Sequence, residues 1–399
     1  MWRCRWAVWL AVVALVVASG TGGSVRAEVP SDRIALLRRG VALTGWFRFP
    51  ASRDPAALRS WIGDGALATL HRVGFTFVRL PVDPALLAEP GVLDALEAAL
   101  RRVHRHELAV VLSLHPVGWT LERSAADRAA LRTAWDRLAP VLQRVGPRMT
   151  VAELLNEPVF PGDPAGWQAV QHALLSAVRT ALPEHTIILS GQDWSSIDGL
   201  LATRPEPDGN VMYGVHLYTP AELTALAPWR SGLDRAALAR LPFPAPDPDR
   251  CRSRAMGGQA PAERAEARAP AGHTTPPSLV AQRGIDAETA GVIAFYCAQG
   301  WDAARVAALV ERAAAWGRQH RVPVLLGEFG ATTALRADAR LAWIRTVRDA
   351  AERAGMGWAL WGYDDVMGFA VDRSRLRQPG PGPPLDPNLL AALGLRAAM

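Results

Sequence analysis

Two glutamates at the ends of apolar runs are the residues in this sequence best suited to chemistry. Glu157 follows the run at residues 149–156 and precedes Pro158, which has no N–H to donate to a strand ladder. Glu328 ends a second apolar run, at residues 322–327. A strand that stops after a carboxylate presents that group at the mouth of a parallel barrel. Two such carboxylates are the groups that cleavage of a glycosidic bond needs.

Eight apolar runs alternate with segments of helical spacing, and each run predicts one buried strand. The predicted strands cover residues 39–47, 75–82, 108–116, 149–157, 185–190, 211–218, 322–328 and 357–362. Continuous apolar strands separated by helices indicate a parallel sheet that is covered on its outer side. Eight such units favour a closed (β/α)8 barrel, a TIM barrel, over an open doubly wound sheet. No glycine-rich phosphate fingerprint follows the first run, which counts against a dinucleotide fold.

The ends of these runs carry a set of side chains that core packing alone does not require. The set consists of Trp46, Arg79, His115, Asn156, Glu157, Trp194, His216, Tyr218, Glu328 and Trp361. Sites form where the carboxyl ends of barrel strands meet, so we expect these residues to converge on one face. The indoles offer flat apolar surfaces to sugar rings, and the polar groups can hold hydroxyls.

These motifs resemble glycoside hydrolase family 5, the cellulase-like family of clan A retaining glycosidases with a (β/α)8 barrel. The likeness rests on Asn156-Glu157-Pro158, on Gly327-Glu328-Phe329-Gly330 and on the matching ends of the second, third, sixth and eighth strands. It covers roughly residues 39–365, apart from an insertion. The family often has Asn where this chain has Ala42.

The resemblance implies that Glu157 is the general acid/base and Glu328 the nucleophile of a double displacement. An acid must be protonated before it can act, so we expect burial and the second carboxylate to raise the pKa of Glu157. Glu328 must stay ionised, and Arg79 and Tyr218 are its expected donors.

The remaining residues of the set would bind substrate, again as the resemblance implies. Asn156 would hydrogen-bond the sugar 2-hydroxyl, and His115 and His216 would bind hydroxyls or orient the carboxylates. Trp361 would form the floor of the subsite that holds the attacked sugar. Trp46 and Trp194, with Trp119, are candidates for flanking platforms. We expect no metal ligand and no cofactor.

The sequence therefore predicts an exported retaining glycosidase that acts on a β-linked polysaccharide or oligosaccharide, with endo-β-1,4-glucanase as the first expectation. A β-mannanase or another β-glucan hydrolase of the same family is the alternative. A metal-dependent hydrolase built on His115, His216 and a carboxylate belongs to a different class, but the first strand lacks His-x-His. A barrel that binds carbohydrate without turnover is a third class, and the intact glutamates speak against it.

The first 27 residues have the pattern of a secretory signal peptide. Arg3 and Arg5 precede an apolar run at residues 6–17, and small residues lead to Ala27. We expect cleavage after Ala27, and a secreted or periplasmic monomer, residues 28–399, without a stable membrane anchor. The leader holds three arginines and no acidic residue, so cleavage lowers the formal net charge from +6 to +3. No run of five like charges marks a nucleic-acid tail, so we expect no nucleic-acid partner.

Residues 228–290 interrupt the alternation and are rich in Pro, Arg, Asp and Ala. We expect an irregular insertion on the catalytic face, which forms a wall or lid of the binding site or else has no role. Cys251 and Cys297 remain after the leader is removed. An even number of cysteines in an exported chain indicates a disulfide, with two unpaired thiols as the alternative.

Overall fold

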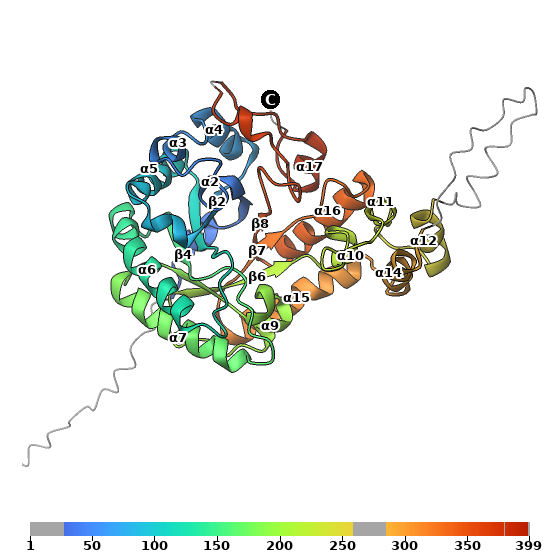
Figure 1. Ribbon diagram of the computed structural model, residues 1–399, viewed down its shortest axis with the longest axis horizontal. Coiled ribbons are helices and arrows are strands. Elements are labelled where there is room, and N and C mark those ends of the chain that lie inside the picture. The colour runs from blue at the N-terminus through green and yellow to red at the C-terminus, as the bar shows by residue number, and fades with distance from the viewer. Residues whose placement is uncertain (1–27, 258–284, 379, 398–399) are drawn as a thin grey trace, which may run out of the picture.

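The computed structural model describes residues 28–257, 285–378 and 380–397, so the predicted signal peptide lies outside the described residues. Eight parallel strands follow one another around a closed barrel in sequence order (Figure 1). They are β1 Arg39–Ala42, β2 Phe77–Val82, β3 Ala109–Leu114, β4 Thr150–Glu153, β5 Ile187–Ser190, β6 Val211–Leu217, β7 Val324–Phe329 and β8 Gly357–Leu360. The predicted (β/α)8 barrel is confirmed.

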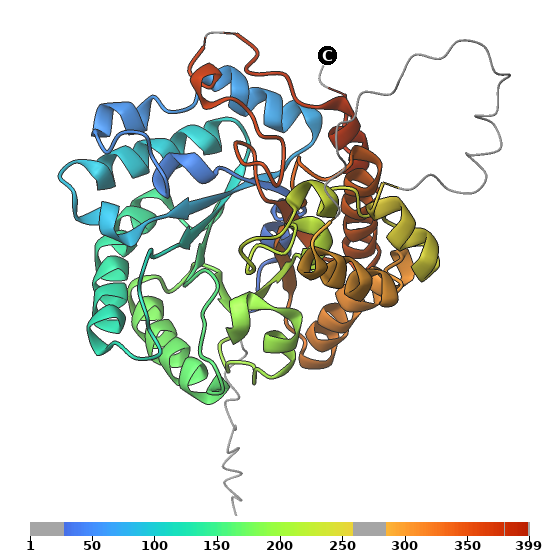
Figure 2. The ribbon, with the colours of Figure 1, turned by 45° about the vertical axis from the view of Figure 1, so that its right-hand side comes forward.

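Helices surround the barrel and pack their apolar faces on the outer side of the strands (Figures 1 and 2). The longer ones are α4 Asp64–Val73, α5 Val92–Arg105, α6 Ala125–Val145, α7 Pro164–Ala181, α15 Ala303–His320 and α16 Ala337–Arg353. Shorter elements are α1 Ser31–Leu36, α2 Thr44–Phe47, α3 Pro55–Arg59, η1 Pro84–Ala88, α8 Gln192–Ser195, α9 Ile197–Leu201, α10 Ala221–Thr224, η2 Arg373–Arg375 and α17 Pro387–Ala392. The local sequence determines where several helices begin. In α7, the Asp163 side chain accepts a hydrogen bond from the Gly166 amide, and Pro164 occupies the first helical position.

The inside of the barrel changes character along its axis. Near the amino ends of the strands the inward side chains are apolar, as with Phe77, Val111 and Met212. Two or four residues further along the same strands stand Arg79, Ser113 and His216, which are also buried. Successive side chains of a strand alternate between its faces, so these positions point to the same interior. The polar set therefore lies at the carboxyl end of the barrel, and apolar side chains fill the interior at the amino end.

Three predicted elements differ from the observed ones. The predicted first strand, residues 39–47, ends at Ala42, and residues 44–47 form α2. The predicted helix at 56–73 is divided into α3 and α4. The fourth strand ends at Glu153, so Asn156 and Glu157 stand on the loop beyond it, where Glu157 has a φ of 46°. A left-handed backbone is uncommon for a residue other than glycine and often marks a functional turn.

Strand β7 carries one extra residue. Val215 of β6 pairs with Leu326, whereas the next residue, His216, pairs with Glu328, so Gly327 is skipped. The register with β8 shifts over the same stretch. This β-bulge redirects the side chain that follows it, and it sets Glu328 opposite His216.

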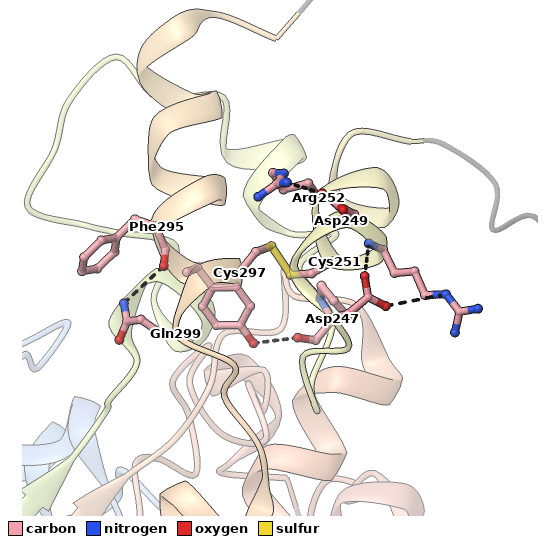
Figure 3. Close-up of a disulfide and its surroundings, with 10 residues drawn as sticks. Asp247, Asp249, Cys251, Arg252, Phe295, Cys297 and Gln299 are labelled. Atoms are coloured by element: carbon pink, nitrogen blue, oxygen red, sulfur yellow. Dashed lines mark hydrogen bonds and ion pairs between the residues drawn. A yellow bond between two sulfur atoms is a disulfide. The ribbon is translucent and has the colours of Figure 1, made fainter.

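The insertion after β6 is partly helical, which corrects the expectation of an irregular segment. It contains α11 Arg235–Leu238, α12 Pro248–Ala255 and α14 Ala287–Ala298. Helices α12 and α14 lie at the edge of the molecule, to the side of the barrel (Figures 1 and 2). The predicted disulfide between Cys251 and Cys297 joins them (Figure 3). Residues 258–284 of the insertion lie outside the described residues.

Candidate active site

Arg79 is the centre of the polar layer inside the barrel. Its side chain is fully buried, and its guanidinium donates to both carboxylate oxygens of Glu153, at 2.8 and 2.9 Å. It also donates to Glu328, to Ser113 and to Asn156. A buried cation is stable only when its donors are satisfied. Arg79 thus fixes residues from β3, the β4 loop and β7 relative to one another.

Glu328 is buried and held by two donors. Arg79 bonds to one carboxylate oxygen, and the Tyr218 hydroxyl donates to the other at 3.0 Å. Both expected partners are therefore present. Burial raises the pKa of Glu328 above its ordinary value, and the carboxylates of Glu157 and Glu153 act in the same direction against His216 and Arg79.

Glu157 is less buried and is held by a histidine. His216 Nδ1 lies 2.9 Å from Glu157 Oε1 and 3.6 Å from Glu328 Oε2. Burial alone would raise the pKa of Glu157, but the hydrogen bond and the positive charges of His216, Arg79 and Arg48 lower it. The expectation of a raised pKa is therefore wrong for the ligand-free protein, because His216 bonds directly to this carboxylate.

The same contact explains the titration of His216. Burial lowers its pKa, but the charges of Glu328 and Glu157 outweigh burial, and the pKa is raised. Both shifts favour an ionised Glu157 beside a protonated His216, and movement of that proton between the two would not change the total charge. A carboxyl group that receives its proton from an adjacent imidazole can still serve as an acid when a basic atom approaches.

His115 packs against Trp361, which lines the site. Their rings stack with centroids 5.9 Å apart and an interplanar angle of 17°. Both ring nitrogens of His115 are buried and, among the described residues, have no hydrogen-bond partner. Burial lowers the pKa of His115 well below its ordinary value, and the nearby cations add to this effect. His115 is buried and does not line the cleft, so its contact with a sugar hydroxyl stays a prediction.

A cleft of about 830 Å³ opens over these residues. Its volume is typical of pockets that bind small molecules, at roughly 300–1,000 Å³. Glu157, His216, Tyr218, Glu328, Trp361 and Trp194 all line it. The cleft thus brings together most of the predicted site residues, and Arg79 and Asn156 support it from below through the hydrogen bonds described above.

Trp46 is an exception to the predicted set. Its indole has no exposed surface, stacks on Trp61 with centroids 5.4 Å apart and donates to the Leu58 carbonyl. Trp46 therefore cannot present a platform to a sugar. The chain turns into α2 directly after β1, and this turn directs the indole into the packing of α3.

Three residues of the site were not among the sequence predictions. Glu153 is the bidentate partner of Arg79, and it lies two positions after Val151, on the inward face of β4. The alternation of the strand is the signal that could have identified it. Arg48 and Trp229 line the cleft from the segments after α2 and α10. Those segments are irregular, so no periodicity in the sequence predicts which way their side chains point.

A metal ion has one possible ligand set in the described part of the chain. One oxygen of Glu157, one nitrogen of His216 and one oxygen of Glu328 lie within 4.8 Å of one another. The set differs from the expected one, because His115 does not belong to it. The donors at these positions also engage one another and Tyr218 in hydrogen bonds, an arrangement that a carboxylate pair adopts without a metal.

Comparison with known proteins agrees with this geometry. Residues 44–240 match the family model described as Cellulase (glycosyl hydrolase family 5). Endoglucanase 3 of Fibrobacter succinogenes is 23% identical over 356 residues, which cover 82% of this chain and 49% of that protein. Endoglucanase C of Acetivibrio thermocellus is 24% identical over 201 residues, 46% of this chain and 58% of that protein. The chain thus spans about half the length of the curated relatives that it matches.

Solved structures show the same fold. Thermotoga maritima Cel5A in complex with mannotriose has a TM-score of 0.66 and 18% identity over 91% of this chain and 99% of that one. A hyperthermophilic endo-β-1,4-glucanase in complex with substrate has a TM-score of 0.64 and 18% identity over 91% and 98%. The match to the family model, the barrel and the paired glutamates lead to one assignment: the chain belongs to glycoside hydrolase family 5.

Proposed function

We propose that this protein is a retaining glycoside hydrolase that cleaves β-1,4-linked glucan, with Glu157 as general acid/base and Glu328 as nucleophile. The carboxylate pair carries the proposal, because one oxygen of each group lies within 4.8 Å of the other. Retaining enzymes hold these groups about 5–5.5 Å apart, and inverting enzymes about 6.5–9.5 Å. The names of the endoglucanase relatives support glucan as the substrate.

In the first step, a carboxylate oxygen of Glu328 attacks the anomeric carbon of the sugar in the cleft. The bond to the leaving oxygen breaks, and that oxygen takes the proton shared by Glu157 and His216. Arg79 and Tyr218 hold Glu328 in position for the attack. Asn156 accepts a hydrogen bond from Arg79 and lies beside Glu157. This position suits it to donate a hydrogen bond to the sugar 2-hydroxyl.

In the second step, water gives a proton to Glu157 and attacks the same carbon. The ester bond to Glu328 breaks, and the carboxylate is released. Glu157 is suited to this step because it has given up its proton in the first step and is ionised. The proton then returns to the pair formed by Glu157 and His216, and the cycle is complete.

Two indoles support action inside a chain rather than at its end. Trp194 and Trp229 line the cleft and are 57% and 61% exposed. The Trp194 amide donates to the Pro158 carbonyl, directly after Glu157, so Trp194 stands on the side of the acid. We infer that both rings support sugars beyond the leaving oxygen, as open clefts with aromatic walls do for extended ligands.

Product analysis tests the proposal. The protein is incubated with carboxymethyl cellulose, barley β-glucan, glucomannan, mannan and xylan, and the products are separated by size. We expect rapid loss of viscosity and oligosaccharides from the β-1,4-glucans. NMR of the first product should show the β-anomer, and release of the α-anomer would contradict the double displacement. A higher rate on mannan, which the mannotriose complex of a structural neighbour makes worth testing, would replace glucan as the substrate.

Two further measurements address the other classes of function. Incubation with a chelator, followed by metal analysis, should leave activity unchanged, whereas activity lost with the metal would support the metal-dependent hydrolase. Binding of cellopentaose without any product would support a carbohydrate-binding barrel.

Export is a separate proposal. No helix in the described residues is long and apolar enough to span a membrane. We propose that residues 1–27 are a signal peptide, so the mature protein would begin at Glu28, in the periplasm or outside the cell. N-terminal sequencing of the exported protein tests the cleavage site, and light scattering tests whether it is a monomer.

A further inference from the structure

Arg48 is a cation in the cleft to which the mechanism proposed above assigns no role. It follows α2 and lines the cleft together with Glu157 and Glu328. Its guanidinium carbon lies 4.7 Å from the centre of the Phe49 ring and 5.4 Å from that of Trp361. Its Nε atom is buried without a hydrogen-bond partner, and within the described part of the chain no carboxylate forms an ion pair with it.

A half-buried arginine without an ion pair is costly unless its charge is balanced by groups at longer range. The groups that face it come from five strands or the loops that follow them. They are Glu328 on β7, Glu157 beyond β4, Tyr218 after β6, and Arg79 on β2, with His115 after β3. Glu328 and Glu157 are the anions of this set. Arg48 therefore interacts with the catalytic pair by long-range electrostatic attraction and not by a direct hydrogen bond.

The charges of the cluster can be counted. Arg79 is positive, Glu153 and Glu328 are negative, and Glu157 with His216 and one shared proton is neutral. These groups carry a net charge of −1, and Arg48 brings the total to zero. The total stays at zero in the glycosyl-enzyme, because Glu328 is then a neutral ester while Glu157 is negative and His216 neutral. A buried cluster that is neutral in both states avoids the cost of an unbalanced charge.

We propose that Arg48 is a positioning residue that acts by charge: it keeps the buried catalytic cluster neutral and so limits Glu157, His216 and Glu328 to one proton. The proposal rests on the proposed function for its consequence in catalysis. Without Arg48 the cluster would take up a second proton, and Glu328 is the group left to accept it. A protonated Glu328 cannot attack the anomeric carbon.

The test separates charge from hydrogen bonding. Arg48→Met removes both, Arg48→Gln removes the charge and keeps N–H donors, and Arg48→Lys keeps the charge. The pH profile of kcat/KM is measured with 2,4-dinitrophenyl β-cellobioside, whose leaving group departs without a proton, so the acid limb reports the ionisation of Glu328. We expect this limb to move up by about one pH unit in Arg48→Met and Arg48→Gln, with a tenfold loss of rate at low pH. Arg48→Lys should keep the profile of the wild type.

Arg105→Met is the matched control, because it removes an equal charge from an exposed position at the end of α5. Its profile should equal that of the wild type. If Arg48→Gln behaves as the wild type while Arg48→Met does not, Arg48 acts as a donor and the proposal is wrong. An unmoved acid limb in both variants also overturns it.

A second readout does not depend on turnover. Glutamate labelled with ¹³C at the side-chain carboxyl reports the titration of Glu328 by NMR, and its signal is assigned as the one lost in Glu328→Gln. The midpoint should rise in Arg48→Met. If the wild type cleaves no substrate, the proposed function is wrong, yet this titration still decides the role of Arg48, since an equal midpoint in both proteins would exclude it.

Discussion

The two ends of the cleft are built on different principles. At the end formed after β8 and β1, Trp361 is 9% exposed, stacks on His115 and has the guanidinium groups of Arg48 and Arg79 within 6.0 Å. At the end formed after β5 and β6, Trp194 and Trp229 are more than half exposed. The first end combines a nearly buried indole with two guanidinium groups, and the second presents exposed apolar faces.

The two ends meet two different requirements of the proposed reaction, bond cleavage and the binding of a polymer. Bond cleavage requires carboxylates held in one geometry, and buried ion pairs supply that rigidity at the cost of tolerance to substitution. Holding a polymer requires surface rather than precision, and exposed indoles supply it. We therefore expect changes near Arg79 to affect both folding and rate, whereas changes near Trp229 should affect only substrates long enough to reach it.

Replacing the glutamates should have the largest effect. We expect Glu328→Gln to lower kcat by roughly 10⁴-fold or more on every substrate, because the proposed nucleophile would be lost. Glu157→Gln should lose as much on cellopentaose but much less in the first step with 2,4-dinitrophenyl β-cellobioside, which needs no acid. Pre-steady-state kinetics measures that step. Equal losses in Glu157→Gln on both substrates would contradict its role as the acid.

Arg79→Met should have the next largest effect, because it leaves Glu153 and Glu328 buried without their cation. Removing one partner of a buried pair costs about 3–5 kcal/mol of unfolding free energy. Urea unfolding followed by circular dichroism measures this loss. Arg132→Met, which breaks an exposed pair with Asp136, is the control and should cost less than about 1 kcal/mol. A similar loss of unfolding free energy in both variants would contradict the role of Arg79 as the buried cation that holds the site together.

The disulfide between α12 and α14, at the edge of the molecule, should contribute about 2–4 kcal/mol, a range typical of such bonds. It joins α12 to α14, and Glu288 of α14 forms an exposed ion pair with Arg230, the residue after Trp229. We expect a reductant to lower the melting temperature of the wild type but not that of the double variant Cys251→Ser/Cys297→Ser. An equal response in the two proteins would show that the bond is not formed.

Replacing one exposed indole should have a smaller effect, confined to long substrates. We expect Trp229→Ala and Trp194→Ala each to lower the ratio of kcat/KM on cellopentaose to that on β-cellobiosyl fluoride by roughly tenfold. The fluoride leaves the far end of the cleft empty, so the ratio isolates that end. Phe295→Ala removes an aromatic ring that is 59% exposed on α14 but does not line the cleft, and its ratio should not change. An equal loss of kcat/KM on both substrates would contradict the assignment of the indoles to sugars beyond the leaving oxygen.

The pH profile of the wild type should show the finest effect. The pKa of Glu328 is raised, so the acid limb of kcat/KM should lie above the ordinary glutamate value of about 4.3. The pKa of His216 is also raised, so the proton shared with Glu157 should persist above about 6.5, and the alkaline limb should lie higher still. Activity should fall as pH drops through the first value and as it rises through the second. An acid limb below 4 would contradict the burial of Glu328.

The sequence predicted those features that depend on strand periodicity. Eight apolar runs were enough for the barrel, and the residues that end them include both glutamates, His216 and Trp361. Features that depend on tertiary contact were not predictable. Trp46 also ends an apolar run, but the chain turns into a helix there and buries the ring against Trp61. The pKa of Glu157 depends on one 2.9 Å contact with a residue 59 positions away.

The extra residue in β7 has a consequence for transferring this site to another protein. Glu328 meets His216 only because Gly327 is omitted from the pairing with β6. A designer who copied the glutamate into a regular strand at the same count from its start would turn the carboxylate toward the surrounding helices. The irregularity must therefore be transplanted together with Glu328, because the carboxylate points into the barrel only when Gly327 is skipped in the ladder.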